Sequence, residues 1–465
     1  MSTKFKTGIL AGVADLYNRL WTDENHSQLQ RLVDETAKSL SGDWIEVIKS
    51  DIVSTAEQIE TACRGFDTED VDLLIVALAP YCPSGVIALA LLKRKIPVVL
   101  WPMQSMFELV PEKYDRAAIN LNHGVHAVQD LASVLRKSNK TFGVIHGHLQ
   151  QNDFRDELNR WVRAGRIVRA MQRANPVQIG GHFEDMLDLQ IGKEAFIKEM
   201  SIEAKIISCD EFCRLLANAD EQQVAQCVSR YREVFDIAED VTDELLTKAA
   251  KGEAAVRSAM LQHKSSACGL NFLELCNDPR IADGLHVAAS ILMKDSFGYA
   301  GEGDWVTAGF VYALQQGFGT ASFTEIFSVG YANNRLVLKH WGEGNFAMAR
   351  AKPKLFYSKF TDRNTAEFIA VDFEFESGDA TIVNLNSTPD GRGQLISITG
   401  QITEDNLPKA TGPRAVFKPT ADDVREVLNE YAYAGGSHHS VLVKGDCTKV
   451  LEKVCRLSGW SYIKL

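Results

Sequence analysis

Residues 71–101 read VDLLIVALAPYCPSGVIALALLKRKIPVVLW and predict the fold of the first part of this chain. The runs 71–77 and 96–101 are rich in branched apolar residues and are typical of buried strands. Pro80 and Pro83 interrupt the apolar stretch 71–101, so we expect no helix there that is long enough to span a membrane. Strands that alternate with helical stretches predict βαβ units, and hence a parallel sheet with helices on both faces.

The same alternation extends over residues 1–150, where further strand-like runs occupy 7–10, 44–48 and 141–145. No GxGxxG or GK[ST] motif follows the first of these runs, which argues against a nucleotide ligand. The loop ALAPYCPSG at 77–85 follows the third run. Parallel sheets usually present their ligand-binding groups at such strand ends.

The rest of the chain changes character twice. Residues 151–315 are more helical and more charged, and the run AKIIS at 204–208 predicts a second α/β domain. Residues 316–465 contain alternating apolar and polar runs separated by turn residues, which predicts an antiparallel barrel or sandwich. The fold class is therefore α/β, with two α/β domains at 1–150 and 151–315 and a β domain at 316–465.

Composition limits the partners and the location. A length of 465 residues predicts two or three domains, and the net charge of -11 disfavours nucleic acid. Nine scattered cysteines without a CxxC pair predict reduced, mostly buried thiols in a cytoplasmic protein. The amino terminus has too short an apolar run for a secretory signal, and we expect no membrane association.

The stretch GEGDW at 301–305 places two carboxylates before an apolar helical pattern. Asp304 directly precedes that pattern and is suited to be its N-cap. Glu302 comes too early to share the cap, and its glycine neighbours let another group approach closely. A structural and a functional role for Glu302 both stay open.

A second carboxylate, Glu325, lies in GTASFTEIFS at 319–328. On a strand it shares one face with Phe323 and Phe327, where a carboxylate is costly to bury without a partner. The partner is either an Arg or Lys side chain or a metal ion.

Histidines supply the remaining candidates. His340 ends a strand-like run, a position where a lone histidine is commonly structural. His438 and His439 are adjacent, and neighbours on a strand point to opposite faces, so only one is expected to reach a common centre. Two glutamates and two histidines form a plausible ligand set for manganese, cobalt, iron or zinc rather than calcium. Glutamates beside a metal also suit proton transfer next to a carbonyl.

Taken in order, these motifs resemble the L-arabinose isomerase family, within the L-fucose/L-arabinose isomerase fold. The stretch at 298–308 resembles the family's GEGDWKTA, and the stretch at 319–328 resembles its GTSFMEDY. LVLKHWGEG at 336–344 corresponds to VLGxHMLEV, and AGGSHHSV at 434–441 to AGGAHHTV. NLNHGVH at 120–126 is similar to NLNQSAH.

The resemblance implies specific roles for these residues. The implied ligands of a divalent metal, most commonly Mn²⁺ with Co²⁺ or Mg²⁺ as alternatives, are Glu302, Glu325, His340 and His439. Sugar contacts are implied for Gln104, His126 and His438. The implied fold is two Rossmann-like α/β domains followed by a C-terminal antiparallel β-barrel. Implied too are homo-oligomers (trimers, tetramers or hexamers) with active sites at subunit interfaces.

The implied reaction is aldose–ketose isomerisation of a monosaccharide through an ene-diol, in which Glu302 and Glu325 move protons. The family's SQHLYG is GVADLYN here, with Ala14 in place of its glutamine, and His123 replaces the glutamine of NLNQSAH. The sugar-contacting rim is therefore expected to differ. Alternatives are a metal-dependent hydrolase, lyase or epimerase acting on a polyol-like substrate, or a non-catalytic sugar-binding protein.

Overall fold

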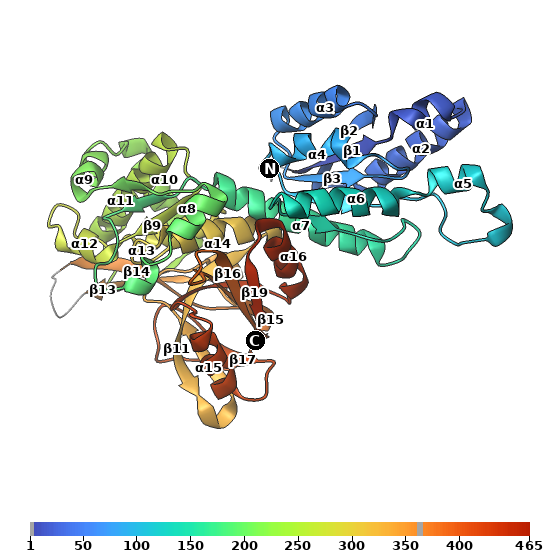
Figure 1. The fold of residues 1–465 in the computed structure, drawn as a ribbon. Coiled ribbons are helices and arrows are strands. Elements are labelled where there is room, and N and C mark those ends of the chain that lie inside the picture. The colour runs from blue at the N-terminus through green and yellow to red at the C-terminus, as the bar shows by residue number, and fades with distance from the viewer. Residues whose placement is uncertain (1–3, 360–365) are drawn as a thin grey trace. The chain divides into compact units, whose positions relative to one another are not determined.

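The computed structural model describes residues 4–359 and 366–465. Contacts between Cα atoms divide the chain into two units, each of which is described by itself (Figure 1). Unit 1 comprises Met1–Arg169 and Glu452–Gly459, and unit 2 comprises Ala170–Leu451 and Trp460–Leu465. The predicted division into three domains stays a prediction.

Unit 1 contains a five-stranded parallel sheet with the strand order β2-β1-β3-β4-β5. Each strand matches one of the five predicted runs, which confirms the parallel α/β prediction. The strands are β1 (Phe5–Gly12), β2 (Ile45–Val53), β3 (Leu73–Ala77), β4 (Val98–Trp101) and β5 (Gly143–Val144).

Helices cover both faces of this sheet. Leu74 and Val76 of β3 pack with α3, α4 and α6 in one apolar core. Leu73 points to the opposite face, where α7 approaches so closely that a Cβ at Gly165 would lie 2.8 Å from the Leu73 Cβ. Helices α2 and α3 begin with capping boxes at Thr22 and Thr55. The helices are α1 (Asp15–Leu20), α2 (Asp23–Leu40), α3 (Ala56–Thr68), α4 (Ser84–Leu92), α5 (Arg116–Leu121), α6 (Gly124–Lys137), α7 (Phe154–Arg173) and α16 (Thr448–Ser458).

Unit 2 begins with a four-stranded parallel sheet of order β10-β9-β6-β7, which confirms the second α/β region. Its strands are β6 (Val177–Ile179), β7 (Lys205–Ile207), β9 (Ala267–Leu270) and β10 (Gly298–Ala300). The helices around it are α8 (Glu194–Met200), α9 (Cys209–Ala217), α10 (Glu221–Val234), α11 (Asp243–Gln262), α12 (Phe272–Asn277), α13 (His286–Lys294) and α14 (Trp305–Phe318).

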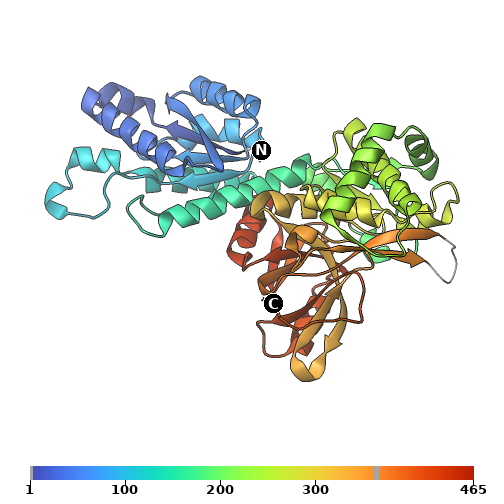
Figure 2. The ribbon, with the colours of Figure 1, turned by 180° about the vertical axis from the view of Figure 1, so that it is seen from behind.

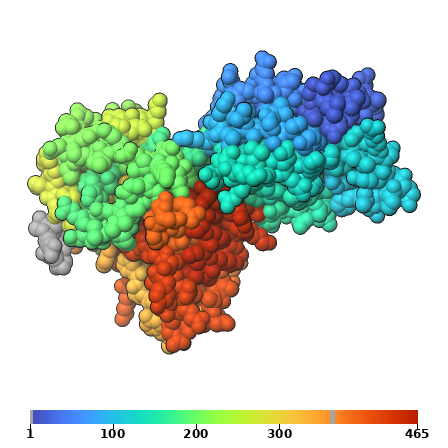
Figure 3. All heavy atoms as spheres, in the orientation of Figure 1, coloured from blue at the N-terminus to red at the C-terminus, as the bar shows by residue number. Residues whose placement is uncertain are grey.

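The second part of unit 2 is a closed antiparallel barrel. The alternating apolar and polar runs predicted either a barrel or a sandwich, and the structure shows the barrel. Strands β16-β15-β18-β11-β12-β17 follow one another, and pairing between β16 and β17 closes the ring (Figures 1 and 2). Apolar side chains such as Leu336, Phe417 and Leu442 fill its core, and its orange and red atoms form one continuous body in Figure 3. The barrel strands are β11 (Ala321–Gly330), β12 (Arg335–Lys339), β15 (Gly378–Ser387), β16 (Gly393–Ile402), β17 (Pro413–Pro419) and β18 (His439–Lys444).

Four further strands extend the barrel sheet at both ends: β8 (Asp236–Ile237), β13 (Lys354–Lys359), β14 (Glu367–Glu374) and β19 (Ser461–Lys464). Helix α15 (Val424–Tyr433) precedes β18. All nine cysteines are free thiols, as predicted, and six of them are buried. Among the described residues, no helix combines the length and apolarity needed to span a bilayer.

Candidate active site

The register of the barrel strands brings three predicted residues together. Strand β11 pairs with β18 on one side, where Glu325 lies opposite His439. On its other side β11 pairs with β12, where Glu325 lies opposite Lys339, so His340 is next to that position. Glu302 reaches the same place from the turn between β10 and α14.

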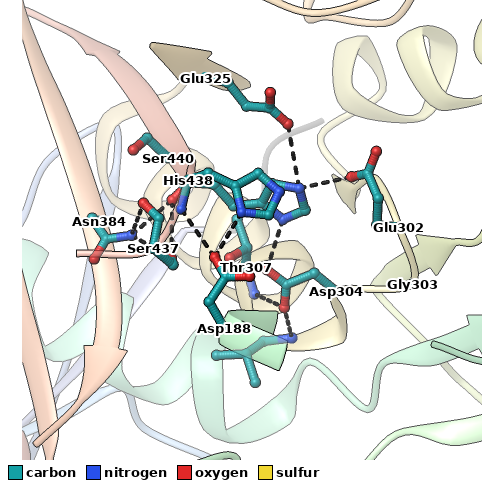
Figure 4. Close-up of polar contacts among 12 residues, drawn as sticks. Asp188, Glu302, Gly303, Asp304, Thr307, Glu325, Asn384, Ser437, His438 and Ser440 are labelled. Atoms are coloured by element: carbon teal, nitrogen blue, oxygen red, sulfur yellow. Dashed lines mark hydrogen bonds and ion pairs between the residues drawn. The ribbon is translucent and has the colours of Figure 1, made fainter. Parts of the chain in front are cut away.

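The four side chains predicted as metal ligands converge. His439 Nε2 lies 2.7 Å from Glu302 Oε2 and 3.4 Å from Glu325 Oε1. His340 Nε2 lies 3.3 Å from Glu325 Oε1 and 3.9 Å from Glu302 Oε1. Figure 4 shows both glutamates directed at one imidazole nitrogen. These imidazoles, rather than an Arg or Lys side chain, are the ion-pair partners of Glu325 in the described chain.

Asp304 has two roles. Its Oδ1 accepts hydrogen bonds from the backbone N–H groups of Val306 and Thr307, which confirms the predicted N-cap of α14. Its Oδ2 lies 2.9 Å from His439 Nδ1, a contact that the sequence did not predict. Because a carboxylate has no hydrogen to donate, His439 donates from Nδ1, and its Nε2 is directed to the glutamates.

Glu343 plays the corresponding part for His340. Its side chain is fully buried, and Oε1 lies 2.8 Å from His340 Nδ1. The same carboxylate accepts from Tyr299 Oη at 2.7 Å and lies 2.9 Å from His286 Nδ1. Sequence reasoning missed Glu343, although its place three residues after His340 was a usable signal.

The electrostatics of the site favour positive charge at its centre. Burial lowers the pKa of His340, but Glu343 and Glu325 more than offset burial and raise that pKa to about 10. Burial lowers the pKa of His439 as well, yet hydrogen bonds with three carboxylates hold it well above its usual value. Burial raises the pKa of Glu325, but hydrogen bonds from both imidazoles bring it to about 2. The carboxylates therefore hold negative charge in a buried place.

Phe323 supports both imidazoles. Its ring packs edge-on against His340 and His439, with centroid distances of 4.8 Å in each case. It shares a strand face with Glu325, as the alternation of β11 predicted. The aromatic ring thus restricts the rotation of both histidines.

The turn that carries Glu302 has an unusual backbone. Glu302 and Gly303 both have left-handed conformations, with φ of +51° and +70°. A Cβ at Gly303 would lie 2.1 Å from the carbonyl oxygen of Gly181, so glycine is required there. At Gly301 a Cβ would make only ordinary contact, 3.5 Å from His340.

The expectation that only one histidine of the pair reaches the centre is wrong. Donor atoms of Glu302, Glu325, His438 and His439 all lie within 4.8 Å of one another. The alternation rule fails because β18 begins at His439, so His438 precedes the strand. His438 is exposed, and its Nδ1 lies 2.6 Å from Asp188 Oδ2 (Figure 4).

The other two predicted sugar contacts belong to unit 1. Gln104 follows β4 and donates from Nε2 to the Met106 carbonyl at 2.7 Å. His126 lies on α6, stacks on Tyr81 with centroids 4.6 Å apart, and has Nδ1 3.2 Å from His123 Nε2. A role for Gln104 and His126 in sugar binding stays a prediction.

The donor set of the site fits a divalent transition metal. Two carboxylates and two imidazoles suit manganese, cobalt, iron or zinc better than calcium, which prefers oxygen alone. Histidines that bind metals usually donate their second N–H to a carboxylate, as His439 does to Asp304. For His340 the carboxylate of Glu343 lies 2.8 Å from Nδ1 as an ion-pair partner. The predicted ligands Glu302, Glu325, His340 and His439 could hold the metal. By the distances among donor atoms, His438 could also bind it together with Glu302, Glu325 and His439.

Comparison with known proteins identifies the family. Sequence models of the L-arabinose isomerase N-terminal, central and C-terminal domains match residues 2–173, 194–317 and 320–461. An L-arabinose isomerase of Thermotoga sp. (strain RQ2) is 24% identical over 94% of this chain and 89% of its own length. One of Acidothermus cellulolyticus (strain ATCC 43068 / DSM 8971 / 11B) is 24% identical over 98% and 92%.

The similarity to solved structures is low. A periplasmic solute-binding protein from Actinobacillus succinogenes 130z with bound D-allose is 14% identical and covers 68% of this chain and 92% of that chain, with a TM-score of 0.18. The three domain matches together extend over most of the chain and confirm the resemblance and the prediction of a sugar isomerase. The chain belongs to the L-arabinose isomerase family.

Proposed function

We propose that this protein is a metal-dependent aldose–ketose isomerase of monosaccharides, with Glu302, Glu325, His340 and His439 as the metal ligands. One observation carries the proposal. Two glutamates from separate elements meet two imidazoles, and the far nitrogen of each imidazole is held by a buried carboxylate. A site that only bound sugar would not need this arrangement, whereas a metal centre does.

When bound, a divalent cation at this centre would polarise the carbonyl and hydroxyl oxygens of an open-chain sugar. An ionised carboxylate at Glu325 can accept a proton. One of Glu302 and Glu325 takes the proton from the carbon beside the carbonyl and returns it to the neighbouring carbon. The other moves the hydroxyl proton, and together they carry the sugar through an ene-diol.

Manganese is the proposed metal, with cobalt or magnesium as alternatives. The proposed substrate is an uncharged monosaccharide, and Ala14 and His123 are proposed to alter the sugar-contacting rim relative to L-arabinose isomerases. Homo-oligomers with active sites at subunit interfaces are also proposed, and sedimentation of the purified protein tests this. The cytoplasmic location stays a prediction.

A panel of aldoses and ketoses incubated with protein and Mn²⁺, with and without a chelator, tests the activity. We expect interconversion of at least one aldose–ketose pair, lost on chelation. Glu302→Gln and Glu325→Gln should each lower kcat by at least about 100-fold, the size of a general acid–base contribution. Glu184→Gln, an exposed glutamate of unit 2, is the matched control.

Product analysis separates the alternatives. Cleaved or dehydrated products would indicate a hydrolase or lyase, and inversion at one carbon an epimerase. Tight sugar binding without turnover would indicate a binding protein. Full turnover by either glutamine variant would refute the proposed proton transfers.

A further inference from the structure

Asp188 contacts the active site from a distant part of the sequence. It lies in the short 3₁₀ helix η2 (Leu187–Leu189), 250 residues before His438. Its Oδ2 lies 2.6 Å from His438 Nδ1, and it also accepts from the His438 backbone N–H at 3.3 Å (Figure 4). The proton transfers proposed above make no use of this carboxylate.

The segment that carries Asp188 is fastened to the turn of Glu302. The backbone N–H of Phe183 donates to the Glu302 carbonyl at 3.2 Å. Gln190 donates from Nε2 to the Phe183 carbonyl at 2.7 Å, which folds the segment back on itself. An exposed ion pair usually joins two flexible side chains. Here the chain is held in place both before Asp188, at Phe183, and after it, at Gln190.

The contact determines which nitrogen of His438 carries hydrogen. An ionised carboxylate only accepts, so His438 donates from Nδ1. Hydrogen bonding to His438, the largest effect, outweighs burial and lowers the pKa of Asp188. In the neutral imidazole Nε2 is then an acceptor. A ring nitrogen of His438 lies within 4.8 Å of the donor atoms of Glu302, Glu325 and His439.

We propose that Asp188 is a positioning residue, which holds His438 in the Nδ1–H tautomer so that Nε2 accepts a hydrogen bond from a sugar hydroxyl. The inference rests on the proposed function. The group accepted is a neutral hydroxyl, because a phosphate dianion would have no hydrogen to donate and would face the carboxylates of Glu302, Glu325 and Asp188.

Nitrogen NMR of protein labelled with ¹⁵N-histidine, in Mg²⁺ to avoid paramagnetic broadening, reads the tautomer. The His438 signals are identified by their loss in His438→Gln. We expect a protonated Nδ1 and an unprotonated Nε2 in the native protein. Asp188→Ala should lose this preference. Asp188→Asn should keep it, because its amide oxygen can still accept from both N–H groups of His438.

The steady-state kinetics and the Mn²⁺ affinity of the same variants are measured as well. In Asp188→Ala we expect kcat/KM to fall about 10- to 100-fold, the range for carboxylates that orient active-site histidines, with Mn²⁺ affinity unchanged. Asp188→Asn should recover much of this loss. Asp185→Ala, which removes an exposed carboxylate from the same segment, should behave like the native protein.

An unchanged tautomer in Asp188→Ala would overturn the inference, and so would equal losses in Asp185→Ala. A parallel loss of Mn²⁺ affinity would also overturn it, since Asp188 would then support the metal rather than the sugar. Failure of the native protein to bind Mn²⁺ or to isomerise any sugar would instead refute the proposed function. The NMR signals do not depend on turnover, so the two failures are distinguishable.

Discussion

Glu302 combines a left-handed backbone with a buried carboxylate in the candidate site. Its left-handed backbone conformation is uncommon outside glycine, and the residue that follows is left-handed too. Such strain persists only where neighbouring contacts enforce it. Here Gln178 Nε2 donates to the Gly303 carbonyl at 2.7 Å, and the Phe183 N–H donates to the Glu302 carbonyl. These contacts aim the carboxylate of Glu302 at His439.

Gly303→Ala should destabilise the fold. A left-handed alanine costs about 1–3 kcal/mol, and the contact of its Cβ with the Gly181 carbonyl adds to this. Chemical denaturation measures the loss in the free energy of unfolding. Gly301→Ala is the matched control, with an expected change within about 1 kcal/mol, because a Cβ there meets only ordinary contacts. Equal losses in the two variants would refute the role of the left-handed turn.

At the scale of elements, Asp304 links helix α14 to strand β18. It caps the helix through one oxygen and holds His439 through the other. Strand β11 is central to the site because Glu325 lies opposite His439 of β18 on one side and opposite Lys339, the residue before His340, on the other. The geometry of the candidate site is therefore set by the strand register and by the start of one helix.

The two functions of Asp304 can be separated by Asp304→Asn. Asparagine is as good an N-cap as aspartate, so the free energy of unfolding should change by less than about 1 kcal/mol. The variant loses the negative charge of the Asp304 carboxylate, which lies beside His439 Nδ1. We therefore expect the affinity for Mn²⁺ to fall about 10- to 100-fold. Calorimetric titration with Mn²⁺ measures the affinity. Unchanged affinity would show that the charge on Asp304 does not support the site.

Lys140, between α6 and β5, gives unit 1 a pH-dependent stability. Its ammonium donates to the Arg94 carbonyl, and burial lowers its pKa to about 8. The unfolded chain keeps the proton up to a pH of about 10.4. Between these pH values the unfolded state binds more protons, so stability rises with pH.

The contribution of Lys140 to the free energy of unfolding is expected to rise by on the order of 3 kcal/mol from pH 8 to 10.4. Lys140→Met removes the titrating group. Because the buried thiols titrate in the same window, the measured quantity is the difference in the free energy of unfolding between native protein and variant, which should increase with pH in favour of the native protein. Identical pH profiles would contradict the assignment to Lys140.

In the folded chain, the candidate site is formed by parts of unit 2 that are far apart in the sequence. Its side chains come from the parallel-sheet region and from the barrel, and Asp188 adds a third segment. A ligand that binds only the folded state should therefore stabilise unit 2 as a body.

Added Mn²⁺ should raise the melting temperature. At a free concentration 100 times the dissociation constant the stabilisation is about 2.7 kcal/mol, which corresponds to roughly 5–10 °C. Differential scanning calorimetry with and without a chelator measures the shift. The double variant Glu302→Gln, Glu325→Gln should show none, and a shift of native size in that variant would place the metal elsewhere.

From the sequence alone, the elements and the residue types of the candidate site could be predicted. Strand runs, helix periods and the N-cap at Asp304 are local patterns, and local sterics and hydrogen bonding govern them. The residue types of Glu302, Glu325, His340 and His439, with their motifs, were enough to predict a metal centre and the family.

Which groups contact one another could be known only from the three-dimensional structure. Contacts between distant segments close the barrel and place Glu325 opposite His439. They also bring the carboxylates of Glu343 and Asp304 next to the two imidazoles. The approach of Asp188 to His438 is of the same kind. Hydrogen bonds act over about 3 Å, and strand register sets which side chains come that close. Such pairings depend on how the whole chain packs, and a local pattern contains no record of them.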